Sequence, residues 1–502
     1  MSGAPIIRAH EPLFSEAEWD FATLERVYKA IEDVALNDLK LDVYPNQIEI
    51  ISSEQMLDAY SSHGMPLMYP HWSFGKLFAR EATLYHKGYT ALAYEIVINS
   101  NPCISYLMEE NTMTMQALVT AHAAFGHNHF FKNNYLFRQW TNAEAILDYL
   151  SFAKNYFARC EEKYGTEAVE QLVDSAHALM DQGVFRYRRP PRPSRAALAE
   201  KRRQRLQYDE ESYNELWRTL PVMPAIQQPE DDDPEFNGGA AALKLPEENI
   251  LYFLEKHSPA LRPWQREVLR IVRNLAQYFY PQRQTKVMNE GCATFVHHTI
   301  LNTLFDRGLL TEGSMLEFLH SHSSVVFQPG FDDPRYSGIN PYALGFAMMA
   351  DIKRLSETPT EEDRAWFPDV AGKGDWRDVL KHAWANFRDE SFIQQFLSPK
   401  VIRDLRLFAM HDEAEDAHYT VGAIHNEEGY RRVRATLSAQ HDFGQREPNI
   451  QVTAADLTGD RRLTLTHFKH RNVKIAPESR DMVLAHVAAL WGHDVVLDEK
   501  DG

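Results

Sequence analysis

The chain has 502 residues, with 53 lysines and arginines against 71 aspartates and glutamates, and a formal net charge of −18. This acidic balance argues against a broad nucleic-acid-binding surface, and the length predicts about two or three domains. Its three cysteines, Cys103, Cys160 and Cys292, are too few and too widely spaced for a disulfide framework, which favours a reducing cytoplasm. We expect neither a secretory signal nor a membrane span, because no apolar run is long enough.

The first predicted elements mix helices with short strands. Apolar residues recur at steps of three and four over residues 19–38, which predicts an amphipathic opening helix. The segments QIEIIS (47–52) and AYEIVIN (93–99) predict two strands, and residues 71–88 between them predict a helix.

A long buried helix is expected next. Residues 106–125 contain no proline or glycine and are rich in Met, Ala and Leu, and Gly126 stands where that helix would end. Further helices are expected over residues 142–183. The first part of the chain therefore predicts strands followed by several helices.

The composition changes after residue 183. A basic, proline-rich stretch and an acidic, glycine-rich one predict an exposed linker; its basic half could touch RNA or anionic lipid, but the neighbouring acidic residues favour a solvated segment. Residues 250–408 are almost wholly helical in pattern. Beyond residue 412, the segments HYTVGAI, NIQVTAADL, RRLTLTHFKH and HDVVLDE predict short strands, with one helix over residues 480–491.

The predicted fold class is therefore α+β and predominantly helical. We predict an N-terminal α+β part of the main body with a histidine cluster (1–183), the exposed linker (184–249), a helical part of the main body with Glu290 (250–411) and a small C-terminal α+β domain (412–502).

The histidine cluster is the first candidate site. His122, His127 and His129 lie within eight residues at the expected end of the long helix. On a regular helix His122 and His127 would point about 140° apart, which is poor geometry for binding one ion. If the helix ends at Gly126, His127 can turn back toward His122. The predicted metal site therefore depends on a helix end at Gly126, with His129 as a secondary ligand.

The segment MNEGCATFVHH (288–298) supplies a carboxylate. Glu290 follows Asn289 at an expected helix start, and His297 lies about 10 Å farther along the axis, which favours a supporting role for His297. Two imidazoles and a carboxylate are typical ligands of zinc, iron or manganese. We predict a divalent metal site formed by His122, His127 and Glu290.

Glu267 is the candidate catalytic residue. It lies on the helix expected before Glu290, with Arg270 three positions later, so it either orients a ligand or forms a surface ion pair. Cys292 is expected to be a packed thiol rather than a nucleophile. No GxSxG, GxxxxGK[ST] or GxGxxG motif occurs, so no nucleotide cofactor is expected.

A purely structural interpretation stays open. The histidines can be core or capping residues satisfied by backbone hydrogen bonds, and Glu290 is favourable in the first turn of a helix.

The order of strand, histidine helix and later Asn-Glu-Gly turn resembles the gluzincin metallopeptidases. The resemblance implies a zincin-like arrangement of strand and helices in the main body. Gluzincins carry HExxH, in which the histidines are four apart and a glutamate activates water, whereas here Ala123 follows His122 and the spacing to His127 is five. The resemblance therefore implies a divergent metallohydrolase without HExxH.

Nearly the whole chain outside the linker resembles the stage V sporulation protein R (SpoVR) family. The resemblance rests on INSNPCISYLMEENTMTMQALVTAHAAFGHNHFFKNNYLF, PWQREVLRIVRNLAQYFYPQRQTKVMNEGCATFVHHTILNTLF, YSGINPYALGF, FIQQFLSPKVIRDLRLF, PNIQV and GDRRLTLTHF. It implies a cytoplasmic bacterial protein linked to spore cortex and peptidoglycan assembly or to stress response. Its implied partners are a serine protein kinase and a von Willebrand-type protein.

Two functions follow as hypotheses. The first is a metal-dependent, hydrolase-like enzyme in which His122, His127 and Glu290 bind the ion and Glu267 and His297 support them. The second is a non-catalytic regulator or scaffold that binds partner proteins, including a kinase.

Overall fold

The structure is a computed structural model. It describes residues 11–61, 68–73, 76, 79–80, 95–187, 203–204, 243, 245–408, 410–411, 420–421, 425–469 and 475–501. Most of the helix expected over residues 71–88, most of the expected linker 184–249 and most of the strand expected over residues 418–424 lie outside the described residues.

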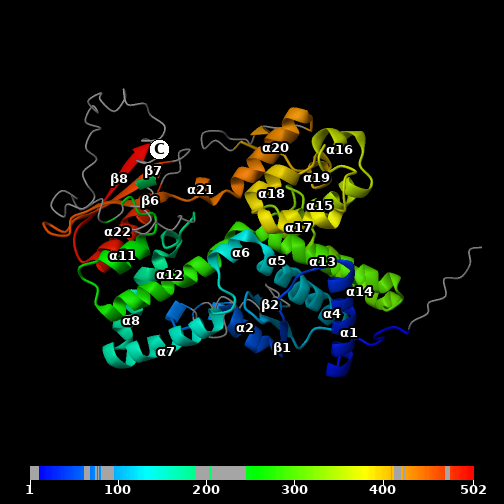
Figure 1. Cartoon of the computed structure of the whole chain (residues 1–502), viewed down its shortest axis with the longest axis horizontal. Coiled ribbons are helices and arrows are strands. Elements are labelled where there is room, and N and C mark those ends of the chain that lie inside the picture. The colour runs from blue at the N-terminus through cyan, green and yellow to red at the C-terminus, as the bar shows by residue number, and fades with distance from the viewer. Residues whose placement is uncertain are drawn as a thin grey trace, which may run out of the picture. The chain divides into compact units, whose positions relative to one another are not determined.

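The chain forms two compact units (Figure 1). Unit 1 comprises residues 1–174 and 274–447, and unit 2 comprises residues 175–273 and 448–502. The chain is mostly helical with small mixed sheets, which confirms the predicted fold class at this level. The domain boundaries at residues 183, 249 and 411 stay predictions.

Unit 1 contains most of the helices. Its elements are α1 (Phe21–Asp33), η1 (Val34–Asp38), β1 (Asn46–Ile51), α2 (Ser53–Ser61), β2 (Glu95–Ile98), β3 (Cys103–Met108), α4 (Met113–Thr120), η2 (Ala121–His127), α5 (Asn128–Asn133), α6 (Tyr135–Trp140), α7 (Ile146–Tyr164), α13 (Lys286–Asp306), α14 (Glu312–Val325), α15 (Pro341–Glu357), α16 (Glu361–Trp366), α17 (Trp376–Asn386), α18 (Asp389–Phe396), α19 (Pro399–Asp404), β4 (Met410–His411), β5 (Thr420–Val421), α20 (Glu427–Gln440) and α21 (Phe443–Arg446).

Unit 2 is smaller and carries its own sheet. Its elements are η3 (Met180–Gln182), α11 (Ile250–His257), β6 (Asn449–Ala455), β7 (Leu463–Lys469), α22 (Pro477–Trp491) and β8 (Val495–Asp501). Strand β7 is central, antiparallel to β6 and parallel to β8. Helices α8 (Thr166–Ala178) and α12 (Pro263–Gln284) each contain a boundary between the units.

The sheet of unit 1 leads directly into the histidine helix. Strand β3 is central, parallel to β1 and antiparallel to β2, so that Ser105 lies opposite both Ile48 and Val97. After β3 the chain enters α4, whose first turn is capped by Thr112, because its hydroxyl accepts a hydrogen bond from the Met115 N–H (3.2 Å). Strand β2 contacts η2, the part of the helix that contains His122 and His127.

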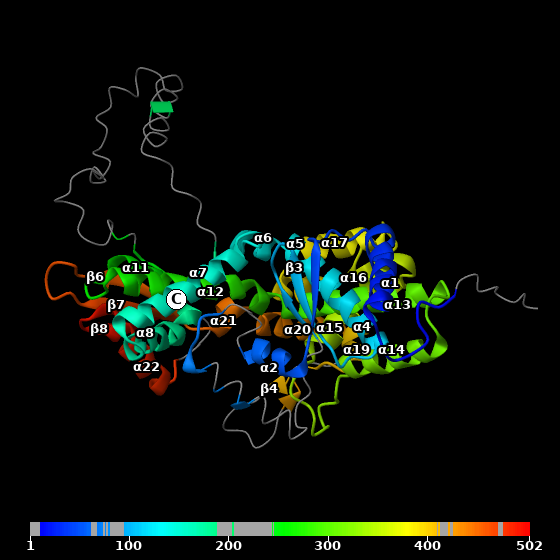
Figure 2. The same ribbon diagram turned by 90° about the horizontal axis from the view of Figure 1, so that it is seen from below.

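Helix α13 forms the centre of the core of unit 1. It packs most extensively against α15 and η2, and its buried residues, such as Val287, Phe295 and Leu301, lie on every face. A helix that is apolar all round is expected to be enclosed by other elements. Figure 1 shows α13 beside α4, α5 and α14, and Figure 2 shows these helices from a second direction.

Two sequence predictions about elements are wrong. Residues 106–108, expected to begin the long helix, instead belong to strand β3, because the segment CISYLM pairs with β1 and β2 and completes the sheet. Residues 427–440, expected among short strands, form helix α20 in unit 1; Asn426 caps it by accepting from the Gly429 N–H (2.8 Å).

Candidate metal centre

The histidines lie on one continuous helix formed by α4, η2 and α5. Segment η2 is a π-helix, and the N–H of Asn128 bonds to the carbonyl of Ala123, five residues earlier. In such a turn, residues five apart lie close to the same face. The prediction of a helix end at Gly126 is therefore wrong, and the π-helix provides the convergence of His122 and His127 that a regular helix could not.

Gly126 brings this helix against α13. A methyl group at Gly126 would lie 2.5 Å from the Cα and 2.9 Å from the Cβ of Ala293, so no larger residue fits without movement of one helix. The close approach sets Glu290, one turn before Ala293 on α13, opposite the histidines.

Helix α13 begins earlier than the sequence predicts. It starts at Lys286, so Glu290 lies in its second turn and not at its first residue. The carboxylate of the buried Asp389 accepts hydrogen bonds from the N–H groups of Val287 and Met288 (2.8 Å each). These bonds satisfy two of the donors that a helix start leaves free.

The three predicted ligands converge. Possible ligand atoms of His122, His127 and Glu290 all lie within 4.8 Å of one another. The Oε2 atom of Glu290 is 3.5 Å from His127 Nε2 and 3.9 Å from His122 Nε2. Donor atoms around a tetrahedral zinc lie roughly 3.4 Å apart, since each bond is about 2.0–2.1 Å. The donor set and its spacing therefore fit a divalent ion after a small contraction.

Two of these atoms are buried without a hydrogen-bond partner among the described residues, His122 Nε2 and Glu290 Oε2. Buried polar atoms almost always have a partner. Since both face the same point, together with His127 Nε2, a cation at that point would satisfy them all.

The remaining polar atoms of the ligands are held in place. Nδ1 of His127 lies 2.9 Å from Oδ1 of Asn289 and can only donate to it, which leaves Nε2 of His127 as the free lone pair. Nδ1 of His122 lies 2.9 Å from Nδ1 of His297, and the hydroxyl of Tyr342 donates to Glu290. Such contacts orient metal ligands. His297 thus lies where a supporting residue was expected.

The pKa values of His127 and Glu290 favour the protonation states that can bind a cation. Burial lowers the pKa of His127 to about 4, so its imidazole is neutral near pH 7. Burial alone would raise the pKa of Glu290, but the neighbouring His127 and His122 and the hydroxyl of Tyr342 hold that pKa below its ordinary value. A neutral imidazole and a carboxylate are the forms that bind metal.

Glu95 is a site residue that the sequence analysis missed. It opens strand β2, and its Oε1 lies 3.6 Å from Nε2 of His122. Burial raises its pKa, His122 lowers it, and the charge of Glu290 raises it further. The signal in the sequence was a single acidic residue inside the apolar strand segment AYEIVIN.

His322 was also missed. Nε2 of His297 lies 3.0 Å from Nδ1 of His322 on α14, so three imidazoles form a hydrogen-bonded chain that begins at His122. Burial lowers the pKa of His322 to about 4. His322 is 32 residues beyond Glu290, and no local spacing pattern connects the two.

The other candidate residues have different surroundings. His129 accepts a hydrogen bond from the N–H of Asp42 (3.0 Å) and packs edge-on against Trp384. Glu267 belongs to unit 2 and pairs with Arg270 (2.8 Å), and its catalytic role stays a prediction. Cys292 is a buried thiol whose pKa burial raises well above its ordinary value, in keeping with a packed residue.

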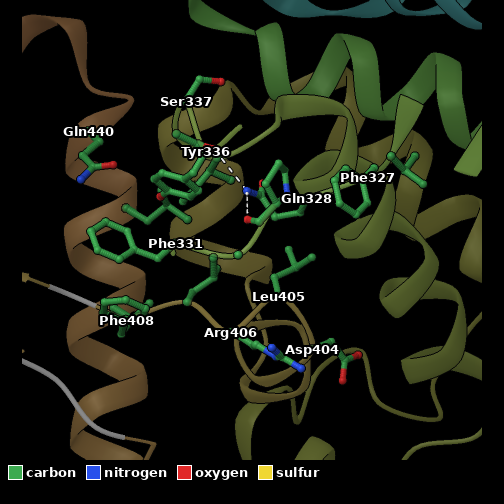
Figure 3. A pocket seen from close by; sticks show the side chains of 18 of the residues that line it. Phe327, Gln328, Phe331, Tyr336, Ser337, Asp404, Leu405, Arg406, Phe408 and Gln440 are labelled. Atoms are coloured by element: carbon green, nitrogen blue, oxygen red, sulfur yellow. Dashed lines mark hydrogen bonds between the residues drawn. The ribbon is translucent and has the colours of Figure 1, made fainter. Parts of the chain in front are cut away.

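Unit 1 also contains a larger pocket of about 1150 Å³ (Figure 3). Three partly exposed aromatic side chains, Phe327, Phe331 and Phe408, line it, and the rings of Phe331 and Phe408 are 5.7 Å apart. Gln328 braces its wall by donating to the carbonyl of Gly338 (3.2 Å). Charged side chains, including those of Asp404, Arg406 and Arg446, also line this pocket, so its surface combines aromatic and charged groups.

Comparison with known proteins gives one family across nearly the whole length. The family model described as "SpoVR like protein" matches residues 18–446, and "SpoVR-like C-terminal domain" matches residues 448–502. The chain is 55% identical over 484 residues to "Uncharacterized protein YcgB" of Escherichia coli (strain K12), a match that covers 96% of this chain and 93% of that protein. No solved structure matches the chain. Among the described residues, no helix has the length and apolarity needed to cross a bilayer.

Proposed function

The chain belongs to the SpoVR family, and from that premise we propose that unit 1 binds a divalent metal ion and acts as a hydrolase-like enzyme. The ligands are His122, His127 and Glu290, and the ion is zinc, iron or manganese. The proposal includes the role that the family resemblance implies, a cytoplasmic one in spore cortex and peptidoglycan assembly or in stress response.

One observation carries the proposal. His122 Nε2 and Glu290 Oε2 are buried, have no hydrogen-bond partner among the described residues, and face His127 Nε2 across 3.5–3.9 Å. An unsatisfied buried polar atom costs roughly 1–3 kcal/mol, and more if it is charged. A bound cation removes this cost for both atoms at once, whereas a purely structural role for the cluster leaves it unexplained.

Glu95 supplies the carboxylate that HExxH would otherwise provide. A bound divalent ion lowers the pKa of a coordinated water toward 7. Glu95 lies beside His122 but outside the group of three close ligand atoms, so its Oε1 can accept a proton from a water next to the ligands. Burial raises the pKa of Glu95, which makes its carboxylate a stronger base for that proton.

The order of elements supports a zincin-like arrangement as part of the proposal. An edge strand carrying Glu95, a helix carrying His122 and His127, and a later helix carrying Glu290 come in the order seen in gluzincins. The two histidines are five apart rather than four, and the π-helix η2 accommodates the extra residue.

Metal analysis tests the proposed ligands. Purified protein, stripped and then reloaded with zinc, iron or manganese, is expected to hold about one ion per chain by elemental analysis. Replacing His122, His127 or Glu290 with Ala is expected to abolish stoichiometric binding. His320→Ala, which removes an exposed histidine on α14, is the matched control. Folded wild-type protein that retains none of the three metals contradicts the proposal.

The role of Glu95 is tested separately. Glu95→Gln keeps the size of the side chain but removes its proton-accepting charge, so the variant is expected to bind metal as the wild type does and to fail to complement a deletion strain. The wild-type gene and the His320→Ala gene serve as positive controls. Full complementation by Glu95→Gln, with metal bound, contradicts an enzymatic role for this carboxylate.

A second candidate function is a regulator that binds partner proteins. The observation that favours it is the aromatic pocket of about 1150 Å³ in unit 1, where Phe327 and Phe331 are 47% and 43% exposed. The family resemblance names a serine protein kinase and a von Willebrand-type protein as partners. If the triple alanine variant of His122, His127 and Glu290 keeps its partners and complements the deletion, while Phe331→Ala does neither, this second function replaces the first.

A further inference from the structure

A second, smaller pocket of unit 1 is lined by cations. It has a volume of about 660 Å³, and its walls come from the end of η1 and the residues after it, from α13, from α15 and from α17. Lys40, Lys353, Lys381 and Arg377 all line it. Four positive side chains around one cavity are unexpected in a chain whose formal net charge is −18.

The floor of this lysine pocket is Trp376, the first residue of α17. Its ring is almost fully buried, and two cations lie over it: the guanidinium of Arg377 at 4.3 Å and the ammonium of Lys353 at 5.1 Å from the ring centroid. Contact with an aromatic face holds a cation in place without neutralising its charge. The ammonium group of Lys353 therefore remains available to an anion, whereas Arg377 also pairs with Asp375.

Lys381 and Lys40 add to this positive field. Burial lowers the pKa of Lys381, and the charges of Lys40 and Arg377 lower it further, whereas Asp378 and Asp375 raise it. Lys40 also has a left-handed backbone, with φ +52°, which is costly for any residue with a Cβ. The unit thus holds like charges close together at a cost in stability.

Among the described residues, the carboxylates at the pocket form no ion pair with the lysines that line it. Asp375 accepts from the Arg377 side chain (3.2 Å) and from its N–H (2.9 Å), which caps α17. Asp38 forms an ion pair with Arg307, outside the pocket lining, and Asp378 is exposed.

The three ammonium groups are left without such pairing. Within the part of the chain that the structure describes, no ion pair or hydrogen bond holds the ammonium group of Lys40, Lys353 or Lys381.

We propose that the lysine pocket binds a small molecule that carries a phosphate or diphosphate group. Lysine ammonium groups are compact donors that suit phosphate oxygens, and several of them can neutralise a multiply charged group. The volume lies within the range of small-molecule sites and exceeds what a single inorganic ion fills. This site is independent of the proposed metal centre, because it shares no residue with it.

Binding of inorganic pyrophosphate tests the proposal. Pyrophosphate also chelates metals, so the titration uses the full chain with His122, His127 and Glu290 replaced by Ala. We expect pyrophosphate to bind in isothermal titration and to raise the melting temperature, and sodium chloride at matched ionic strength to do neither. Lys381→Met and Lys353→Met keep the aliphatic stems and are each expected to weaken binding roughly tenfold.

Lys400→Met is the matched control. Lys400 lies on α19, pairs with Asp404 and is not part of the pocket lining, so its loss removes one positive charge from the surface only. Binding that is absent in the background chain, or equally strong in all three lysine variants, overturns the proposal. Because the metal ligands are already removed, neither result bears on the metal centre.

Discussion

His127 can present Nε2 to Glu290 because Asn289 holds its other ring nitrogen. The contact from Nδ1 of His127 to Oδ1 of Asn289 is 2.9 Å and buried. Without the amide, the imidazole can rotate or adopt the tautomer whose Nε2 carries the proton. The metal affinity that we propose would therefore depend on Asn289, which lies outside the proposed ligand set.

We expect Asn289→Ala to weaken zinc binding about 10- to 100-fold, the usual effect of losing such a partner. Competition against a chromophoric chelator measures the dissociation constant. Asn302→Ala is the control, because Asn302 lies on the same helix and its side chain donates to the carbonyl of His298 (2.6 Å), away from His127. Equal affinity in the two variants would mean that Asn289 does not orient His127.

The sequence predicts the three residues that converge better than it predicts their surroundings. His122, His127 and Glu290 were recognisable because imidazoles clustered along a predicted helix and a carboxylate followed in a later one. Glu95 and His322 were not, because each reaches the cluster only through the packing of β2 or α14. Residue type and local spacing carry information about ligands, whereas their neighbours are a property of the tertiary fold.

The crossing of η2 and α13 brings the two ligand-bearing helices together. Gly126 permits it, since a Cβ there would lie 2.5 Å from the Cα of Ala293. Helix α13 makes a second close approach through Gly291, where a Cβ would lie 2.6 Å from the Cα of Gly345 on α15. Helix α13 is thus packed between η2 and α15, and its backbone lies in close contact with the backbone of each.

We expect Gly126→Ala to lower the free energy of unfolding by about 1–3 kcal/mol, because one helix must move away from the other. The movement also separates Glu290 from the histidines, so metal affinity should fall with stability. Urea unfolding and elemental analysis measure the two effects.

Gly313→Ala is the matched control for this prediction. Gly313 lies in the first turn of α14, and a Cβ there would meet only the Thr311 hydroxyl, at 3.8 Å. Alanine favours a helix by roughly 1 kcal/mol over glycine, so this variant should be as stable as the wild type or more so. If Gly126→Ala behaves like Gly313→Ala, the close crossing is not what positions the site.

The extent of the helices was more predictable than their internal geometry. The opening helix over residues 19–38 appears as α1 and η1, and the helix expected over residues 480–491 appears as α22. The π-helix η2 was not foreseen, because its residues have no distinctive composition and the extra residue is accommodated by packing against α13. The error at Gly126 has the same origin: a glycine that permits a close crossing looks in the sequence like a glycine that ends a helix.

At the scale of the molecule, the site belongs to a unit built from two separate stretches of chain. Unit 1 takes residues 1–174 and 274–447, and each stretch contributes part of the ligand set. Neither stretch contains the candidate site alone, so the proposed metal binding would be coupled to the folding of unit 1. If unit 1 binds a metal as we propose, its stability would control the affinity of the site, and conditions that unfold it would release the ion.

Four histidines with lowered pKa values make unit 1 sensitive to acid. Burial lowers the pKa of His127, His129, His322 and His441 from 6.5 to about 4. Between pH 6.5 and pH 4 the unfolded chain binds protons at these histidines that the folded unit does not bind. The contribution of the neutral histidines to stability is therefore present above pH 6.5 and is lost as the pH falls toward 4. Asp389 acts in the opposite direction, because burial raises its pKa to about 7 and its carboxyl is protonated first in the folded unit.

Since four histidines outweigh one aspartate, we expect the free energy of unfolding to fall by on the order of 3 kcal/mol per pH unit near pH 5. Urea unfolding followed by circular dichroism at pH 7, 6 and 5, with EDTA present so that metal release does not contribute, measures this slope. His322→Gln should reduce the slope by about 1.4 kcal/mol per pH unit, because one proton fewer is taken up on unfolding.

His320→Gln, at an exposed position on the same helix, is the control and should leave the slope unchanged. A stability that is level or rises between pH 7 and pH 5 would mean that these imidazoles are already charged in the folded unit, and a charged His127 could not serve as a ligand.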